Sequence, residues 1–279
     1  MATSARDMRT GAYLCAKTRR MRYFMNLSYK GTNYHGWQIQ RNAPSVQAEL
    51  ERALSTVLRL PTPVTGAGRT DTGVHARDYT AHFDAAPVAE AEALRYHLNA
   101  MLPDDIAVHR IRRVRDDAHA RFSAAEREYR YFIESRKNPF TRRAAWHYYR
   151  PLDVERMDRA AASLLEYDDF TSFAKLNSNN KTNICRIVRA GWEESPEGVY
   201  RFTIRADRFL RNMVRALVGT LVDVGRGRYD VEEFRAIVES RDLSRASGGA
   251  PAEGLYLWDV AYPAGVFRRG ERTRNLLFN

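Results

Sequence analysis

The spacing of hydrophobic residues changes between two periods along the chain. Tyr79, Ala81 and Phe83 alternate with polar residues, which is typical of a half-buried strand. From residue 46 to residue 58, apolar residues instead recur at helical spacing, and Ser45 precedes them as an expected N-cap. The pattern therefore predicts a chain that contains both strands and helices.

The same two periods predict elements over most of the sequence. Strands are expected over residues 22–29, 79–84, 106–114, 128–133, 186–192, 199–207 and 255–262. Helices are expected over residues 45–58, 94–101, 153–167, 209–224 and 231–240. Polar stretches of small residues at 177–183 and 244–252 are expected to be loops. Because strands and helices follow a similar order in both halves, an α+β duplication is favoured over a doubly wound parallel sheet.

The length of 279 residues is that of roughly two domains of about 150 residues each. We expect one half over residues 21–115 and the other over residues 116–279. Residues 1–20 are basic but contain no continuous apolar run, so they do not resemble a secretory signal. They are expected to form a disordered extension.

The charge of the chain narrows the class of partner. Lys and Arg number 45 against 34 Asp and Glu, which gives a net charge of +11 and a pI near 9.8. An excess of this size indicates a polyanionic partner, most simply a nucleic acid. An acidic membrane surface is the weaker alternative, because the sequence has neither a basic amphipathic helix nor a polybasic run beside an anchor. No apolar run approaches the roughly 20 residues of a membrane span.

Metal and disulfide chemistry are not expected. The two cysteines, Cys15 and Cys185, lie far apart and lack the spacing of a metal site. Their number fits a reducing compartment, and we expect a cytoplasmic protein. The seven histidines form no pair at the four-residue spacing of a helical zinc site.

Residues 66–76, with the sequence GAGRTDTGVHA, are the most informative stretch of the chain. Their three glycines allow sharp turns, and Arg69 and Asp71 lie two positions apart. If this piece is extended, the cation and the carboxylate point to the same side, as suits a site for a charged substrate. A solvated ion pair on a tight loop is an equally open interpretation. The glycine spacing fits neither a dinucleotide fingerprint nor a P-loop.

Two further patterns concern nucleic-acid contacts. Arg208, Arg211 and Arg215 line up at helical spacing after a strand that ends with Arg205, and a solvated basic face is the simpler interpretation of this series. Arg215, however, lies inside an apolar helix, where arginine tends to pair with a carboxylate or a phosphate. Tyr129 shares a strand face with a second tyrosine at position 131. Core packing is expected for at least one of the two, and a stacking platform for a base is the alternative.

Several blocks of the sequence, taken together, resemble the tRNA pseudouridine synthases of the TruA type. The blocks are residues 66–76, Gly31-Thr32-x-Tyr34-x-Gly36-Trp37-Gln38, Leu102-Pro103-Asp104-Asp105-Ile106, His119-Ala120-Arg121-Phe122, Arg127-x-Tyr129-x-Tyr131, Phe209-Leu210-x-x-Met213-Val214-Arg215 and Ala250-Pro251-Ala252-x-Gly254-Leu255-Tyr256-Leu257. They follow the family's order from about residue 22 to residue 262. Lys30, where an aspartate is common, and Arg77-Asp78, where Gly-Gln is common, depart from the pattern.

The resemblance implies an activity and a fold. The family isomerises uridine to pseudouridine at positions 38, 39 and 40 of the tRNA anticodon stem-loop, without a metal or an organic cofactor. Its fold is α+β, with two ferredoxin-like halves related by a pseudo-twofold axis and antiparallel sheets joined around a central basic cleft. It acts as a homodimer that grips tRNA.

The resemblance also implies roles for single residues. Asp71 is the catalytic aspartate, and Arg69 helps to displace the target base. Tyr129 stacks on the uracil, and Arg215 pairs with Asp71. Arg205, Arg208 and Arg211 are expected to contact the RNA.

Two other classes of protein compete with this interpretation. A catalytically silent RNA-binding protein or RNA chaperone shares the basic excess, but it does not need the combination of Arg69, Asp71, Tyr129 and Arg215. A nucleotide-dependent enzyme is disfavoured by the glycine spacing. Trp37, Tyr34 and His75 are expected to have structural roles.

Overall fold

A computed structural model describes residues 20–175 and 181–268 of the chain. The expected extension over residues 1–20 lies outside the described residues except for Arg20, and so does part of the expected loop at 177–183. The strands expected from the sequence are all present, with shifted ends. Two short strands, near Thr65 and Trp146, were not expected.

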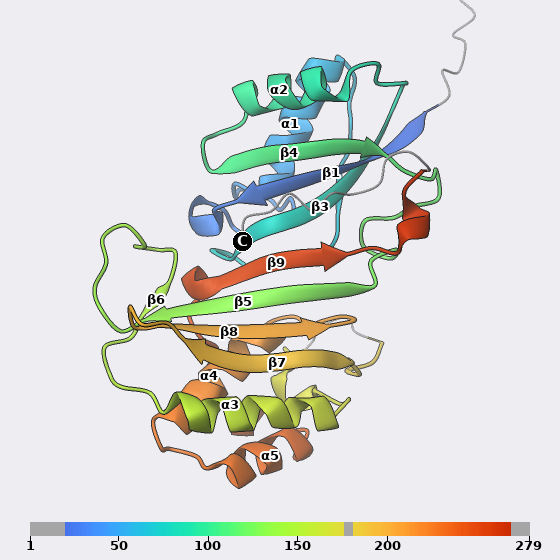
Figure 1. Ribbon diagram of the computed structural model, residues 1–279. Helices are drawn as coiled ribbons and strands as arrows, with labels where there is room; N and C mark the ends of the chain where they lie inside the picture. Colours follow the sequence, from blue (N-terminus) through green and yellow to red (C-terminus); the bar gives the residue numbers. More distant parts are fainter. Residues whose placement is uncertain (1–19, 176–180, 269–279) are drawn as a thin grey trace, which may run out of the picture.

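The described strands form one sheet in the order β4-β1-β3-β9-β5-β8-β7, with β2 beside β3 and β6 beside β5 (Figure 1). Their bounds are β1 Met21–Tyr29, β2 Thr65–Gly66, β3 His75–Ala85, β4 Ile106–Arg113, β5 Glu126–Glu134, β6 Trp146–His147, β7 Ile187–Glu194, β8 Val199–Ala206 and β9 Leu255–Ala261. Most pairings are antiparallel, and β3–β9 and β5–β6 are parallel. The expectation of a mixed α/β chain around a mostly antiparallel sheet is confirmed, while the pseudo-twofold relation of two halves stays a prediction.

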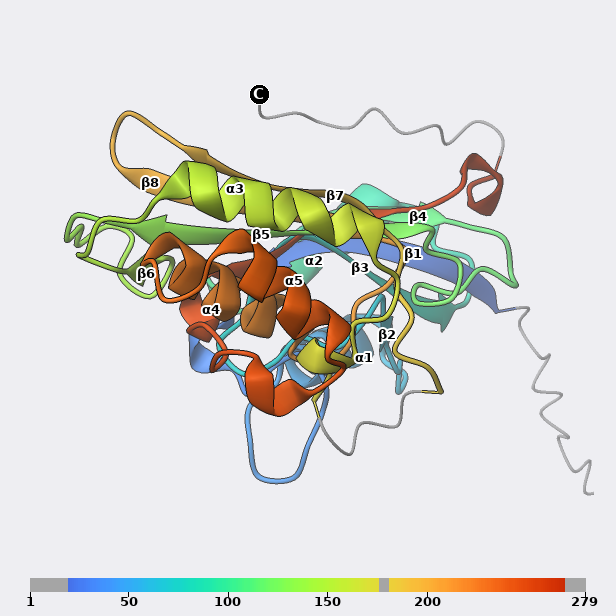
Figure 2. The same ribbon diagram turned by 90° about the horizontal axis from the view of Figure 1, so that it is seen from below.

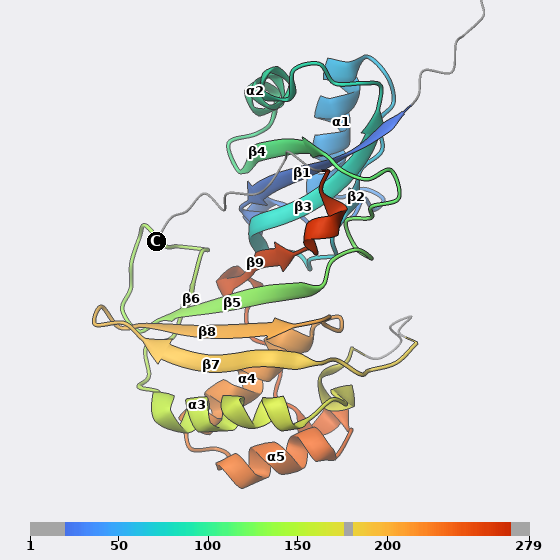
Figure 3. The same cartoon turned by 45° about the vertical axis from the view of Figure 1, so that its right-hand side comes forward.

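The last strand, β9, lies in the middle of this sheet and joins its two parts. β9 lies between β3 and β5 (Figure 3), and its parallel pairing with β3 involves His75 with Tyr256 and Ala76 with Leu257. Leu257 packs into the hydrophobic cluster of β1, β3 and the first two helices, although it comes from the last part of the chain. The two parts of the sequence therefore meet at β3 and β9.

Five α-helices lie against one face of the sheet in the described residues, and Figure 2 shows α1, α4 and α5 on that side. Their bounds are α1 Val46–Leu58, α2 Ala91–Met101, α3 Val154–Ser163, α4 Met213–Gly225 and α5 Val231–Glu239. Residues that face each other across the ladders, such as Tyr129 with Ile204 and with Leu257, belong to the same face. That face is covered by two hydrophobic clusters, one under α1 and α2 and one under α3, α4 and α5.

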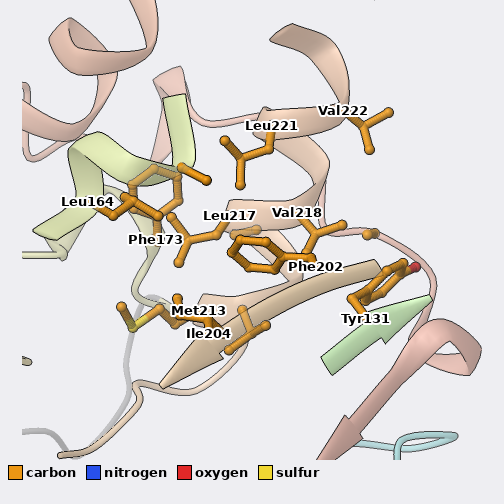
Figure 4. Packing of buried hydrophobic residues seen from close by; sticks show 14 of the residues in the cluster. Tyr131, Leu164, Phe173, Phe202, Ile204, Met213, Leu217, Val218, Leu221 and Val222 are labelled. Carbon is orange, nitrogen blue, oxygen red and sulfur yellow. The ribbon is translucent and has the colours of Figure 1, made fainter. Parts of the chain in front are cut away.

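The larger cluster is an apolar layer between β5, β8 and the last helices (Figure 4). Tyr131, Phe202 and Ile204 point from the strands toward Leu217 and Val218 of α4, and all five are fully buried. Tyr131 is therefore the tyrosine that packs in the core, and its hydroxyl donates to the carbonyl of Pro251 at 2.7 Å. Burial of such side chains is the main stabilising contribution to the fold.

Helix caps agree with the sequence signals at several ends. The Ser45 hydroxyl accepts from the amide of Ala48 at 3.3 Å, and Asp153 caps α3 in the same way. The helix expected over residues 209–224 instead begins at Met213, because Asn212 has left-handed backbone angles with φ of 64°. Arg208 and Arg211 therefore lie in the segment before the helix. No helix in the described residues is long and apolar enough to span a membrane.

Candidate active site

A cleft of about 1180 Å³ opens on the helical face of the sheet, where the two hydrophobic clusters meet. Its walls come from the glycine-rich stretch at 66–76, from β5, and from residues 208–215 at the start of α4. The cleft is therefore lined by segments from both parts of the chain. These parts meet at the β3–β9 junction (Figure 3).

One carboxylate stands among many cations in this cleft. Asp71 is the acidic residue among the described lining residues, and its side chain is 30% exposed. The basic lining residues are Arg69, Arg121, Arg127, Lys175, Arg208, Arg211 and Arg215. A cleft that concentrates one sign of charge attracts an oppositely charged partner, so this cleft suits a polyanion.

The segment that carries Asp71 is held by backbone hydrogen bonds. The amide of Trp37 donates to the carbonyl of Thr70 at 3.3 Å, and the amide of Val74 donates to the carbonyl of Asp71 at 3.1 Å. The Thr70 hydroxyl is also within hydrogen-bond distance of the Tyr29 hydroxyl, at 2.9 Å. Arg69, Thr70 and Asp71 all line the cleft, and Thr70 is the buried member of the three. That the two charged side chains point to one side stays a prediction.

Glycines shape this segment in two different ways. Of the three glycines between residues 66 and 73, Gly73 has a positive φ, of 80°. Gly36, on the neighbouring loop, has φ of 93°, and a Cβ atom there would lie 2.3 Å from the carbonyl oxygen of Thr70. Both the backbone angle and the close approach require glycine, so the two loops pack backbone against backbone.

His75 has the expected structural role. Its Nδ1 accepts from the amide of Gly31 at 2.9 Å, so the proton lies on Nε2, which donates to the carbonyl of Glu253 at 3.1 Å. Burial lowers the pKa of His75 to about 4. Trp37 and Tyr34 are also buried, as expected, and Trp37 stacks on Tyr79 with ring centroids 4.1 Å apart.

Tyr129 lies in the wall of the cleft and is half-buried. It packs against both hydrophobic clusters. The rings of Tyr129 and Phe209 make an edge-to-face contact, with centroids 5.1 Å apart. Burial raises the pKa of the Tyr129 hydroxyl to about 12, and the negative charge of Asp71 contributes in the same direction. Its environment is thus intermediate between a core residue and an open stacking platform.

The ion pair of Asp71 differs from the expected one. Arg211 Nε lies 3.8 Å from Asp71 Oδ1, whereas Arg215 donates from Nε to the carbonyl of Ala250 at 2.7 Å. The amide of Ala250 in turn donates to the carbonyl of Arg215 at 2.9 Å. Arg215 therefore fastens the 244–252 segment to α4 while still lining the cleft, and the pairing of Arg215 with Asp71 is not formed among the described residues.

The other expected RNA contacts separate into two groups. Arg208, Arg211 and Arg69 line the cleft. Arg69 is exposed, and it makes no ion pair or hydrogen bond with any residue that the structure describes. Arg205 is not brought to the cleft. It follows the inward-facing Ile204, so it points to the opposite face of the sheet, where it pairs with Asp259 at 2.7 Å.

Arg127 is a site residue to which the sequence patterns assigned no role. Its guanidinium donates to the carbonyls of Asp207 at 2.8 Å and Arg121 at 2.5 Å, and more weakly to those of Ala67 at 3.4 Å and Ala124 at 3.3 Å. These carbonyls belong to three different walls of the cleft. Arg127 lies two residues before Tyr129 on β5, and this spacing was the signal that could have placed it on the cleft side.

No group of three or more histidine, cysteine or acidic side chains suited to a metal occurs in the described part of the chain. The chemistry that the described site can offer is one carboxylate, several guanidinium groups and a tyrosine ring.

Known proteins with similar sequences support one family. A family model described as tRNA pseudouridine synthase matches residues 160–263. The chain is 53% identical over 248 residues to tRNA pseudouridine synthase A of Bacteroides thetaiotaomicron, an alignment that covers 88% of this chain and 92% of the relative. It is 52% identical to the protein of that name from Porphyromonas gingivalis (88% and 99% covered) and 41% identical to that from Bacillus subtilis (87% and 99% covered). With identity of this level over most of its length, the chain belongs to the tRNA pseudouridine synthases, a family of isomerases.

Proposed function

We propose that the protein isomerises uridine to pseudouridine in tRNA, at positions 38, 39 and 40 of the anticodon stem-loop, with Asp71 as the catalytic carboxylate. The observation that carries this proposal is the single carboxylate of Asp71, which lines the same cleft as Tyr129 while the other charged lining residues are arginines and a lysine. The substrate is suggested by the names of the relatives, each a tRNA pseudouridine synthase A.

The reaction matches the residue types of the cleft. The N1–C1′ glycosidic bond breaks, the uracil turns, and C5 bonds to C1′. N1 gains a proton and C5 loses one, so nothing is oxidised overall. Cleavage develops positive charge at the sugar carbon, and a carboxylate can stabilise or capture such a centre. Asp71 supplies this group, and Arg211 Nε lies 3.8 Å from its Oδ1.

The target base must leave the helical stack before it can reach Asp71. Extrusion of a base costs a few kcal/mol, which contacts to the rest of the RNA must offset. Arg69 is exposed at the cleft and has its donors available, so we assign to it the displacement of the target base. Tyr129 offers its ring to the uracil from the cleft wall. Arg208 and Arg211 contact the phosphates.

Arg215 takes part in a different way in this proposal. Its Nε is occupied by the carbonyl of Ala250, so it holds the wall of the cleft, and its remaining guanidinium donors line the cavity. Direct pairing with Asp71 remains the expectation for the RNA-bound state. A shift of the Arg211 side chain onto a phosphate would leave Asp71 open to that partner.

We further propose a cytoplasmic homodimer. The helix-free face of the described sheet carries Phe132, Tyr256 and Trp258, whose rings contact one another, and Trp258 lies between the guanidinium groups of Arg77 and Arg130. A second copy of the chain would cover these half-buried aromatic side chains. Sedimentation equilibrium tests this directly, and a monomer at micromolar concentration would contradict it.

The experiment that tests the activity compares Asp71→Asn with Asp104→Asn. The second variant makes the same chemical change on an exposed loop away from the cleft. Each protein is given an unmodified tRNA transcript labelled with tritium at uridine C5, which the isomerisation releases to water. Asp71→Asn should bind the tRNA and release no tritium, while Asp104→Asn should match the parent protein.

The alternative is a catalytically silent RNA-binding protein, which shares the basic cleft. Absence of turnover by the parent protein on any anticodon stem-loop uridine would favour that alternative. Substantial turnover by Asp71→Asn would instead refute Asp71 as the catalytic carboxylate.

A further inference from the structure

Phe122 is a large apolar side chain that the structure leaves in water at the cleft. It is 76% exposed, and it belongs to the lining of the cavity that contains Asp71. Other exposed aromatic residues, such as Phe140 at 94% and Tyr149 at 72%, do not line this cavity. A single exposed apolar residue needs no special explanation, so its surroundings decide whether Phe122 has a role.

The loop that carries Phe122 is unusually well tied for a surface loop. His119 Nδ1 accepts from the amides of Arg121 and Phe122, at 3.1 and 3.3 Å. The amide of Ser123 donates to the carbonyl of His119, and the amide of His119 donates to the Ser123 hydroxyl, both at 2.9 Å. These bonds fix the backbone on both sides of Phe122.

The same loop is anchored to the body of the protein at three points. The amide of Ala120 donates to Nδ1 of the buried His82 at 3.1 Å, and the Tyr262 hydroxyl donates to the carbonyl of Ala120 at 2.5 Å. Arg127 holds the carbonyl of Arg121. Arg127 also reaches the carbonyl of Ala67 in the glycine-rich loop, at 3.4 Å, so one side chain contacts both the loop of Phe122 and the loop of Asp71.

The ring of Phe122 is presented with its own aromatic and cationic neighbours. The His119 imidazole lies 4.4 Å from it between centroids, tilted by 37°, and the guanidinium carbon of Arg121 lies 5.5 Å from its centroid. These contacts fix the ring without covering it, as its exposure shows. A fixed, open aromatic face beside a guanidinium suits a nucleobase, because every base has a π-face and its phosphate is anionic.

The size of the cleft leaves room for more than the reacting nucleotide. Its volume of about 1180 Å³ exceeds the range of about 300–1,000 Å³ that is typical of a site for one small molecule. Tyr129 is half-buried in the wall, whereas Phe122 is exposed. The two rings are therefore suited to two different bases.

We propose that Phe122 forms a second nucleobase subsite, on which a base adjacent to the extruded uridine stacks. This proposal rests on the proposed function, because it takes the target uridine to lie at Tyr129 and Asp71. Stacking on Phe122 replaces part of the stacking that the neighbouring base loses when the target leaves the helix. Phe122 is thus a substrate-positioning group, distinct from the reacting centre.

The test uses fluorescence, so that it does not depend on turnover. Two anticodon stem-loop RNAs carry 2-aminopurine on the 5′ or the 3′ side of the target, and each is bound to protein with Asp71→Asn. Stacking on an aromatic ring quenches this base, so one of the two RNAs should lose fluorescence on binding. Adding Phe122→Ala should abolish that quenching and weaken RNA binding roughly 5- to 100-fold, the range expected for the loss of one stacked base.

Three further variants make the test specific. Phe122→Trp should restore quenching and affinity, while Phe122→Leu, which keeps apolar bulk without a ring, should restore neither fully. Tyr149→Ala removes an equally exposed ring outside the cleft and should change nothing. Unchanged melting temperatures would confirm that each variant is folded.

Several outcomes would overturn the subsite. The subsite is refuted if quenching survives in Phe122→Ala, or if neither RNA is quenched by protein that keeps Phe122. It is also refuted if Phe122→Leu binds RNA with full affinity, or if Tyr149→Ala loses as much affinity as Phe122→Ala. Failure of the proposed function is seen separately, as absence of tritium release by the parent protein. Phe122-dependent quenching without turnover would leave the subsite standing and reject the enzyme.

Discussion

Replacement of Arg127 gives the sharpest test of how the cleft is built. Its guanidinium bonds join the carbonyls of Ala67, Arg121 and Asp207, which lie in the glycine-rich loop, the Phe122 loop and the segment before α4. Arg127→Met keeps an unbranched apolar stem but removes every donor. Arg127→Lys keeps the positive charge but loses the fork that reaches several carbonyls at once.

The energetic effect follows from the distances. Hydrogen bonds that involve a charged group contribute about 1.5–3 kcal/mol each. Two of the Arg127 bonds are short, at 2.5 and 2.8 Å, and two lie near the limit at 3.3 and 3.4 Å. The residue is half-buried, so water can replace part of what is lost. We therefore use the lower value for the two short bonds and expect Arg127→Met to lower the free energy of unfolding by about 3 kcal/mol.

The effect on turnover should be larger than the effect on stability suggests. A shift of about 1 Å between reacting groups can cost roughly 100-fold in rate, and Arg127 links the carbonyl of Ala67 in the glycine-rich loop to those of Arg121 and Asp207. We expect kcat/KM for tritium release to fall about 100-fold in Arg127→Met at a temperature where the variant is folded. Arg127→Lys should recover little of this loss, because geometry rather than charge is missing.

Two results would refute this reasoning. Full activity in Arg127→Lys would mean that Arg127 serves only as a positive charge for the RNA. Full activity in a folded Arg127→Met protein would mean that the walls hold their positions without it. Chemical denaturation measured beside the kinetics separates unfolding from misplacement.

Three further predictions follow from the same structure. Gly36→Ala should lower the free energy of unfolding by about 3 kcal/mol or more, because the new Cβ would meet the Thr70 carbonyl and the φ of residue 36 is positive. Gly265→Ala is the control: its Cβ would enter open space, so thermal unfolding should be unchanged. His75 has a pKa of about 4 in the folded protein and 6.5 in the unfolded chain, so the free energy of unfolding falls as pH drops from 6.5 toward 4, by roughly 3 kcal/mol at most. In His75→Asn, the denaturation midpoint should depend less on pH over this range. Arg208→Ala should weaken tRNA binding at low salt and reduce the slope of log K against log salt by about 0.7–0.9 in filter binding; an unchanged slope would place Arg208 off the RNA.

Local features of this sequence were sufficient to predict most of the strands and helices and to single out Asp71. Period-two and helical spacing are properties of short segments, so β3, α1 and the Ser45 cap could be read without knowledge of the fold. Asp71 stood out for the same reason, because its glycines and Arg69 lie within a few positions of it. The structural role of His75 also followed from its loop.

The tertiary structure decided which residues the arginine side chains of the site contact. Helical spacing grouped Arg208 and Arg211 with Arg215, but the left-handed backbone at Asn212 takes the first two off the helix and places Arg211 beside Asp71. Which face a strand residue occupies depends on pairing, so Arg205 points away from the cleft.

Arg127 shows the same limit most clearly. Its role depends on carbonyl groups of Ala67, Arg121 and Asp207, which are far apart in the sequence and meet only in the folded chain. Backbone carbonyls carry no sequence signal, since every residue has one. The residue types and local geometry of the site were thus determined by the sequence alone, and the contacts between its walls were decided by how the sheet brings β3, β5 and β9 together.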